Sequence, residues 1–133
     1  MEPSENEYRA QRLDNMQKLQ EMGYEPFGHA FQRSGRLADI RATFEESKRV
    51  SAAGRMMTVR DMGGSIFADL RDGSDRLQVF AGKKQLSPEA FQAFKLLDIG
   101  DHVGVEGALF TTRTGEKTIL IDKWVLLSKA LLP

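Results

Sequence analysis

The sequence contains no cysteine, so disulfide frameworks, thiolate zinc sites and catalytic thiols are all excluded. Long apolar runs are missing too, because none approaches the roughly 20 residues that are needed to span a bilayer. Residues 1–7 are acidic and polar, unlike a signal or transit peptide. These absences predict a soluble cytoplasmic protein in a reducing compartment, with no membrane partner.

A surplus of positive charge is also absent, since 19 Lys and Arg residues balance 19 Asp and Glu residues. Proteins that coat nucleic acid without selectivity rely on such a surplus, because the release of counterions drives their binding. The composition excludes that class. If the chain binds RNA, we expect local and weak binding, through a few bases and a few well-placed charges.

Residues with catalytic potential are scarce. The two histidines lie in different predicted elements, without the spacing of metal ligands. Asp69 and Asp72 could together hold a magnesium ion, but two neighbouring cations, Arg71 and Arg76, would neutralise them. No nucleophile stands beside a base. We therefore predict no catalytic residue and no metal site, which disfavours an independent hydrolase or metalloenzyme.

The first third of the chain, residues 1–47, is predicted to form a helical extension. Ser4 and Glu7 have the spacing of a capping box, and Gly23 stands where a C-terminal cap belongs. Between them a narrow apolar stripe recurs every three positions, at Leu13, Met16, Leu19 and Met22. After a loop over residues 24–34, we expect a second short helix that is capped by Ser34. Its apolar face consists of Leu37, Ile40 and Phe44.

From Lys48 onward the apolar period changes to two, which is typical of half-buried strands. Five strands are expected, over residues 50–60, 65–72, 76–81, 102–110 and 117–127. Gly54 predicts a bulge or bend in the first strand. A helix capped by Ser87, with Pro88 at its first position, lies between the third and fourth strands. This order predicts a mainly β, five-stranded OB-fold barrel over residues 48–133.

Phe67 connects this fold to a function. If alternate residues of the second strand, such as Ile66 and Ala68, face the core, Phe67 points to the opposite, polar face. A ring placed there suggests a platform for a nucleic-acid base, because OB-folds bind their ligands on the second and third strands. Gln78 lies on the same face, where its amide could read the edge of a stacked base. The alternative is that Phe67 packs beneath the N-terminal helices.

Three more residues are candidates for contacts with RNA. Arg60 at the end of the first strand, and Arg55 within it, could reach a phosphate or stack on a base. Glu116, in the last turn, could accept hydrogen bonds from the imino or amino groups of a base. Taken singly, each of the three is more simply explained as a solvated surface residue.

Several short motifs, in this order, resemble those of a known family. They are Gly54-Arg55-Met56-Met57-Thr58-Val59-Arg60-Asp61-Met62-Gly63, Phe67, Leu77-Gln78-Val79-Phe80, Asp98-Ile99-Gly100-Asp101, Gly107-Ala108-Leu109-Phe110-Thr111-Thr112-Arg113-Thr114-Gly115-Glu116 and Leu126-Leu127-Ser128-Lys129-Ala130-Leu131-Leu132-Pro133. Upstream, residues 12–19 and 23–27 are similar to the family's leading helix. From about residue 9 to residue 133, the chain resembles the N-terminal, anticodon-binding OB-fold domain of class II lysyl-tRNA synthetases.

The resemblance implies a role for four side chains. Phe67 would stack on an anticodon base, and Gln78 would read that base. Arg60 and Glu116 fall on the family's first-strand arginine and its turn glutamate. Together the four would recognise a uridine-rich anticodon, whose middle uridine is shared with the aspartyl and asparaginyl enzymes. The implied partner is tRNA, bound at its anticodon loop, and the full-length protein would be a homodimer.

Two departures from the family lie beside this face. Gly64 stands where the family commonly has lysine, and Asp69 where it often has histidine or threonine. The loss of a cation and the gain of a carboxylate should weaken contacts with phosphate. The catalytic motifs of the family, with their pockets for ATP, magnesium and the amino acid, would lie beyond Pro133. We therefore expect no cofactor in this segment and no activation of lysine by it alone, whether it is an excised domain or a free-standing relative.

Other functions stay open at this point. The narrow apolar stripe of the first helix needs a covering surface, which favours a protein-interaction or dimerisation module. A free-standing OB domain for single-stranded nucleic acid, or a relative of the aspartyl or asparaginyl type, is a further alternative.

Overall fold

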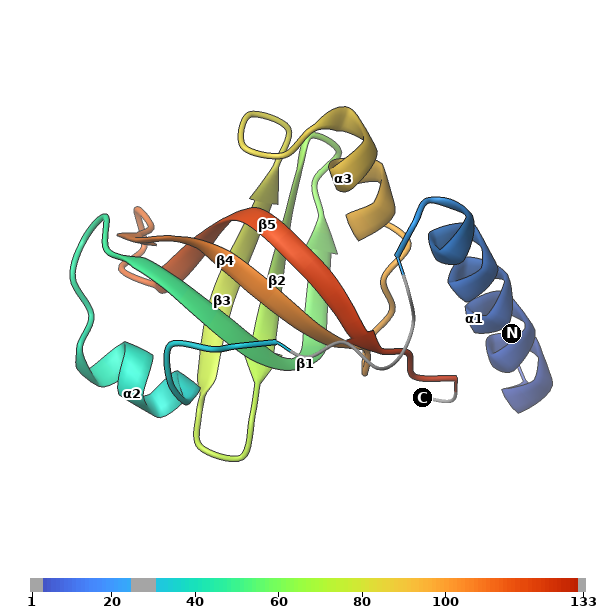
Figure 1. Ribbon diagram of the computed structural model, residues 1–133, viewed down its shortest axis with the longest axis horizontal. Coiled ribbons are helices and arrows are strands. Elements are labelled where there is room, and N and C mark those ends of the chain that lie inside the picture. Colours follow the sequence, from blue (N-terminus) through green and yellow to red (C-terminus); the bar gives the residue numbers. More distant parts are fainter. Residues whose placement is uncertain (1–3, 25–30, 132–133) are drawn as a thin grey trace.

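Five strands close a barrel in the order β1-β2-β3-β5-β4, which confirms the predicted OB-fold. They are β1 (Arg49–Asp61), β2 (Ser65–Arg71), β3 (Arg76–Gly82), β4 (His102–Thr111) and β5 (Lys117–Ser128). β3 and β5 pair in parallel, and the other neighbours are antiparallel. The computed structural model describes residues 4–24 and 31–131 (Figure 1). Its helices are α1 (Glu5–Glu21), α2 (Leu37–Ala42) and α3 (Pro88–Phe94), and α3 lies between β3 and β4 as expected.

The long strand β1 serves two neighbours because it bends. Its first half pairs with β4 and its second half with β2, and the register with β2 shifts between Met56 and Val59. The bulge therefore does not lie at Gly54. The sequence predicts a bulge or a bend at this residue, and of these two the bulge is wrong. Gly54 is instead a point of close approach, since a Cβ atom there would lie 3.0 Å from the carbonyl oxygen of Arg71. Such proximity is a second common reason for glycine in a strand.

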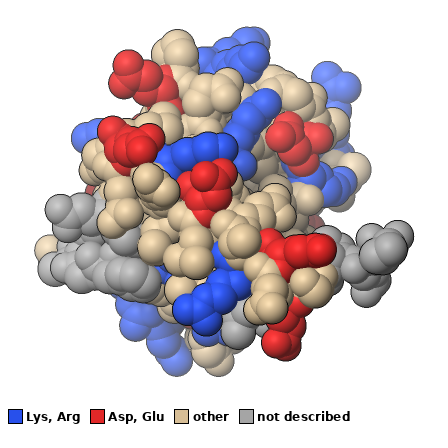
Figure 2. All heavy atoms as spheres, turned by 90° about the vertical axis from the view of Figure 1, so that its right-hand side faces the viewer, with Lys and Arg blue, Asp and Glu red and all other residues tan. Residues whose placement is uncertain are grey.

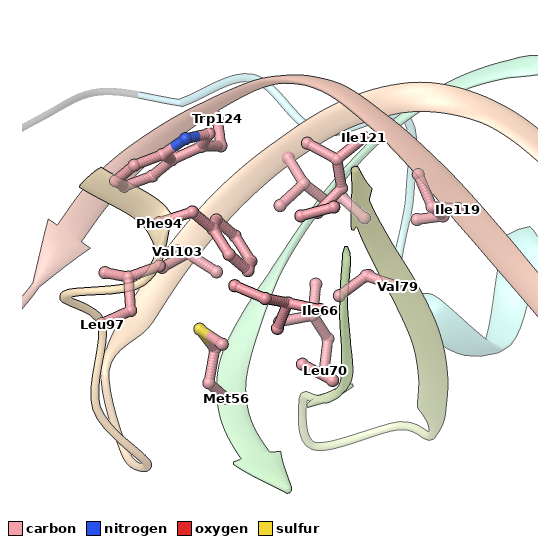
Figure 3. Close-up of a cluster of buried hydrophobic side chains, with 14 of the residues drawn as sticks. Met56, Ile66, Leu70, Val79, Phe94, Leu97, Val103, Ile119, Ile121 and Trp124 are labelled. Atoms are coloured by element: carbon pink, nitrogen blue, oxygen red, sulfur yellow. The ribbon is translucent and has the colours of Figure 1, made fainter. Parts of the chain in front are cut away.

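The core fills the barrel with alternate residues of every strand and is closed at one end by α3. Ile66, Leu70 and Val79 are at most 2% exposed. Phe94 points from α3 toward these side chains and packs edge-on against Trp124, with 5.5 Å between ring centroids (Figure 3). Burying large apolar side chains in this way is the main favourable contribution to folding.

α1 forms as its capping signals predict. The Ser4 side chain accepts a hydrogen bond from the Glu7 backbone N–H, and the Glu7 carboxylate accepts one from the Ser4 backbone N–H. The apolar stripe is only partly covered, because Leu19 is fully buried whereas Leu13 and Met22 are 38% and 40% exposed. No helix in the described ranges is long and apolar enough to cross a membrane.

α2 begins later than the sequence predicts. Its N-cap is Arg36, not Ser34. Ser34 instead pairs with β1, since its hydroxyl accepts the backbone N–H of Ser51 and its own N–H donates to the Ser51 carbonyl. The N-terminus of α2 is held by Asp72, whose carboxylate accepts the N–H of Leu37 at 3.0 Å. Residues 25–30 of the predicted loop, and Leu132 and Pro133 of the last motif, lie outside the described residues.

A buried ion cluster joins the end of β5 to the segment that precedes β4. The Lys129 ammonium is fully buried and lies 2.8 Å from Asp101, which is also fully buried, and 2.5 Å from Asp98. Asp98 also accepts hydrogen bonds from Asn15, and Arg12 donates to the Ala130 carbonyl. The cluster therefore fixes α1 beside the C-terminal end of β5 (Figure 1).

Candidate nucleic-acid interface

The outward face of β1, β2 and β3 brings together three of the predicted binding residues. In the hairpin register Phe67 lies opposite Phe80, and Asp69 lies opposite Gln78. On β1, Arg60 lies opposite Phe67. Because side chains alternate along a strand, the buried positions of β2 leave Phe67 and Asp69 on the outer face. Strand periodicity correctly predicts this placement of Phe67 and Gln78, whereas Arg60 reaches the same face through the register shift of β1 between Met56 and Val59.

Phe67 is half-buried, and aromatic and cationic groups surround its ring. The ring lies edge-on to Phe80 with 4.8 Å between centroids, and the Arg60 guanidinium carbon is 5.4 Å from the Phe67 centroid. Phe110 extends the row, 6.3 Å from Phe80. The described parts of the N-terminal helices are held elsewhere, α1 beside the end of β5 and α2 at the β2–β3 turn. Phe67 is therefore not packed beneath them.

Gln78 is held in one orientation by a chain of hydrogen bonds. Its Nε2 donates to Thr118 Oγ1 at 3.0 Å, and the Thr118 hydroxyl donates to the Glu116 carbonyl at 3.1 Å. Since Thr118 uses its proton on Glu116, it must accept from Gln78, which fixes the amide with its oxygen on the other side. Among the described residues, that oxygen has no hydrogen-bond partner. One acceptor and one N–H of Gln78 thus have no partner among the described residues, although the residue is buried, with 9% of its surface exposed.

Arg76 joins two carboxylates on this face. Its guanidinium contacts Asp69 at 2.7 Å and Glu116 at 2.9 Å. The hydrogen bond that Arg76 donates to Asp69 is the largest cause of the raised pKa of Arg76. The expectation that Arg76 neutralises Asp69 is confirmed, so the carboxylate gained at position 69 is not a free negative charge. Glu116 is the second partner, which sequence reasoning missed.

The ion pair with Arg76 positions the Glu116 carboxylate through one of its two oxygens only. Arg76 contacts the Oε1 atom, and Oε2 has no hydrogen-bond partner within the described part of the chain. Two signals could have identified the link from Arg76 to Glu116. Arg76 and Gln78 are two positions apart on β3 and so share a face, and β3 pairs in parallel with β5. The first is visible in the sequence, whereas the second requires the closed barrel.

Arg55 does not join this group. It lies at the other end of the β1–β2 pairing, opposite Arg71 and next to His102. Its side chain is exposed, as is that of Arg60. Four of the five residues predicted from the sequence therefore form one cluster, which also includes Arg76. The fifth, Arg55, lies apart from it.

Charges of both signs are mixed on the surface. On the face that includes α1, Lys and Arg alternate with Asp and Glu without a continuous region of one sign (Figure 2). Within the described residues, no group of three or more His, Cys, Asp or Glu side chains is placed to hold a metal ion. The aromatic and polar cluster on β1, β2 and β3 is therefore the clearest candidate interface.

Comparisons with known proteins agree with this geometry. Residues 50–127 match the tRNA anti-codon family, which is described as an OB-fold nucleic acid binding domain. The chain is 39% identical over 132 residues to a lysine–tRNA ligase of Moorella thermoacetica, and 38% identical over 130 residues to that of Carboxydothermus hydrogenoformans. These alignments cover 98% and 96% of this chain. A lysine–tRNA ligase of Staphylococcus epidermidis is 35% identical over 133 residues, which cover 92% of this chain.

The chain spans about a quarter of the length of these curated relatives, since each alignment covers 27% of the relative. The family match alone covers more than half of the chain and includes all five strands of the barrel except their outermost residues. From the barrel topology and this match, we conclude that the chain belongs to the tRNA anti-codon family of OB-fold nucleic acid binding domains.

Proposed function

We propose that the chain binds the anticodon loop of a tRNA and reads a uridine-rich anticodon, as the anticodon-binding domain of a lysine–tRNA ligase. The observation that carries this proposal is the Phe67 ring, which lies on the outer face of β2 beside a Gln78 amide whose oxygen has no partner in the described part of the chain. Three relatives that are named lysine–tRNA ligase support the choice of tRNA. Activation of lysine with ATP and magnesium would belong to parts of such an enzyme outside this segment.

The central base would stack on Phe67 and meet Gln78 at its edge. Stacking of a base on an aromatic side chain contributes about 1–3 kcal/mol and tolerates any base. Selectivity therefore has to come from hydrogen bonds. Uracil presents an N3–H donor between two carbonyl oxygens, and this pattern matches the free Gln78 oxygen and its remaining N–H. Cytosine presents an acceptor at N3, which would face the Gln78 oxygen without a proton between them.

Two charged residues would add to these contacts. Arg60 would help to position the RNA, and Glu116 would make a second contact with a base. Arg60 is exposed over the edge of the platform, where its guanidinium can reach a phosphate or a base. Arg76 holds Glu116 by one oxygen, so the other oxygen is oriented for a base N–H. A pre-positioned acceptor of this kind loses less side-chain entropy on binding than a free glutamate would.

The test is titration of a fluorescent anticodon stem-loop RNA with the 133-residue chain. One RNA has uridine at the central anticodon position, and the other has cytidine there. Phe67→Ala should weaken binding of both RNAs by about 5- to 150-fold, the equivalent of one stacked base. Gln78→Leu should reduce the preference for uridine more than it reduces affinity for cytidine.

Tyr8→Ala is the matched control, because it removes a partly exposed aromatic ring from α1, away from the interface. Thermal unfolding of each variant separates loss of binding from loss of fold. Equal affinity of wild type and Phe67→Ala, or no preference of wild type for the central uridine, would contradict the proposal.

Self-association is a second candidate, which the exposure of Leu13 and Met22 on α1 favours. Exposed apolar side chains on one helix face are stabilised when another surface covers them. Light scattering of wild type and of a Leu13→Gln, Met22→Gln double variant tests this. A monomer at all concentrations would exclude self-association, whereas a dimer that the double variant abolishes would support it.

A further inference from the structure

Two arginines face each other across β1 and β2, and no described residue supplies a counter-charge to either. Arg55 and Arg71 are directly opposite in the register, and like charges in that position are destabilising. In the described ranges neither guanidinium has a carboxylate within ion-pairing distance. Other arginines of the chain do have such partners, namely Arg33, Arg36, Arg41, Arg49 and Arg76. The uncompensated pair is therefore a local excess of positive charge on an otherwise balanced surface.

The pair lines a concavity of about 310 Å³ together with Met57, Asp72, Gly73 and His102. The pKa of His102 is lowered, first by partial burial and second by the Arg55 guanidinium. At neutral pH its imidazole is therefore a neutral group that can still donate one hydrogen bond. The concavity is large enough to admit a phosphate group, and two guanidiniums can each bind phosphate oxygens in a bidentate manner.

Asp72 does not neutralise the two arginines. Its carboxylate already accepts hydrogen bonds from the backbone of Leu37, Ser74 and Asp75, and from the Ser74 hydroxyl. Its nearest cation is Arg33, at 3.8 Å. The Asp72 side chain is thus committed to the β2–β3 turn and to α2. Since no carboxylate of residues 4–24 and 31–131 pairs with Arg55 or Arg71, an anion from outside the chain can balance them.

The concavity lies on the same side of the sheet as the base platform. Phe67 and Arg71 are four positions apart on β2, so both point outward. Strand geometry places their Cα atoms about 13 Å apart. A short stretch of RNA can span this separation. Because the spacing is set by a paired strand, a ligand bound at both points would be held in one register.

We propose that Arg55, Arg71 and His102 bind a backbone phosphate of the same RNA whose base stacks on Phe67. This inference rests on the proposed function and adds a second anchor to it. The phosphate contact would set the register of the loop without reading its sequence, as phosphate contacts generally do. It would also supply affinity that the neutral overall charge does not.

The experiment compares Arg71→Gln and Arg55→Gln with the control Arg9→Gln, which removes an exposed arginine of α1. Each chain is titrated with the uridine and cytidine stem-loops between 50 and 200 mM salt, a range over which phosphate contacts weaken strongly. Arg71→Gln should weaken both RNAs by the same factor, about ten-fold, as the loss of a charged hydrogen bond predicts. The slope of log K against log salt should fall by about 0.7 to 1. Arg9→Gln should change neither value.

The outcomes separate this inference from the proposed function. If Arg71→Gln and Arg55→Gln keep the affinity and salt slope of the control, the phosphate site is overturned, even where Phe67→Ala abolishes binding. If Phe67→Ala has no effect while Arg71→Gln lowers the slope, base stacking fails and the phosphate site stands.

A second arm titrates inorganic phosphate while the His102 ring protons are followed by NMR. A shift that disappears in Arg71→Gln supports an anion site in this concavity. The same shift without any effect of the two variants on RNA affinity would show a site for free phosphate instead, and would overturn the proposal. Folding should not confuse these results, since removal of one cation of a repelling pair leaves the barrel at least as stable.

Discussion

Removing the buried Lys129 ammonium should destabilise the barrel strongly. In Lys129→Met the side chain keeps its approximate volume, but Asp101 loses its counter-ion while remaining fully buried. Breaking a buried pair in this way typically costs about 3–5 kcal/mol. The backbone N–H groups of Asp98 and Ala130 still donate to Asp101, both at 2.8 Å, so we expect about 3 kcal/mol. That is a large fraction of the 5–15 kcal/mol typical of a domain.

The cost should depend on pH. Burial raises the pKa of Asp101 above its ordinary value of 3.8, and its hydrogen bonds, including that from Lys129, act in the opposite direction. Without Lys129 the pKa should rise further. A carboxyl with a raised native pKa binds a proton more tightly when folded, so stability is lost as the pH rises through that pKa. Lys129→Met should therefore be closer to wild type at pH 5 than at pH 8.

Urea unfolding followed by circular dichroism gives the measurement. With a slope of about 1–3 kcal/mol per molar urea, a loss of 3 kcal/mol lowers the midpoint by at least ~1 M. The control is Lys129→Met combined with Asp101→Asn, which removes both buried charges and should recover part of the loss. The reasoning would be refuted if Lys129→Met costs less than about 1 kcal/mol. It would also be refuted if the loss in the double variant equals the sum of the losses that Lys129→Met and Asp101→Asn cause singly.

Three further predictions concern the barrel and its charges. Gly107→Ala should abolish or severely weaken folding, because its Cβ would lie 1.8 Å from the Leu120 carbonyl oxygen, whereas Gly73→Ala, which meets nothing within 4 Å, should change the melting temperature little. Burial alone would raise the pKa of Asp72, but hydrogen bonds from the β2–β3 turn and α2 lower it to about 2. The charged Asp72 therefore stabilises the fold by about 2 kcal/mol above pH ~4, and this stabilisation is lost as the pH falls toward 2. In Asp72→Asn, the free energy of unfolding should therefore change less with pH on the acid side. Arg76→Met should release the two carboxylates that it bridges and weaken RNA binding at 50 mM salt; an equal effect at 500 mM salt would contradict this, because salt screens such charges.

The element order and the outward position of Phe67 could be predicted because both depend on local periodicity. Alternation along residues 65–71 is enough to place Phe67 opposite the core. The cap of α2 could not be predicted, because Ser34 has a better partner in Ser51, which is far from it in the sequence. Likewise the bulge of β1 was assigned to Gly54, whereas the actual reason for that glycine is the backbone of Arg71.

The candidate site shows the same division. The alternation of side chains along β2 and β3 is enough to place Phe67 and Gln78 on one face, and this alternation is visible in the sequence. The bridge from Arg76 to Glu116 requires β5 to lie beside β3, and this pairing joins residues that are 40 positions apart. From the residues alone Glu116 is more simply a solvated turn residue, since a turn carboxylate has no periodic signal. The family resemblance is what favours it as a binding residue. Contacts that depend on the pairing of distant strands could therefore not be predicted from the sequence.

The parallel pairing of β3 with β5 also sets the order in which the interface can assemble. β2 and β3 are joined by a four-residue connection, and hairpins of this kind form in about 1–10 μs. Gln78 and Thr118 are 40 residues apart and meet only when the barrel closes, and barrels with many distant contacts fold in milliseconds to seconds. The hairpin thus presents Phe67 early, without the partner that orients Gln78. If Phe67 stacks a base as we propose, a folding chain would expose this ring long before it acquires the oriented Gln78 amide that would tell one base from another.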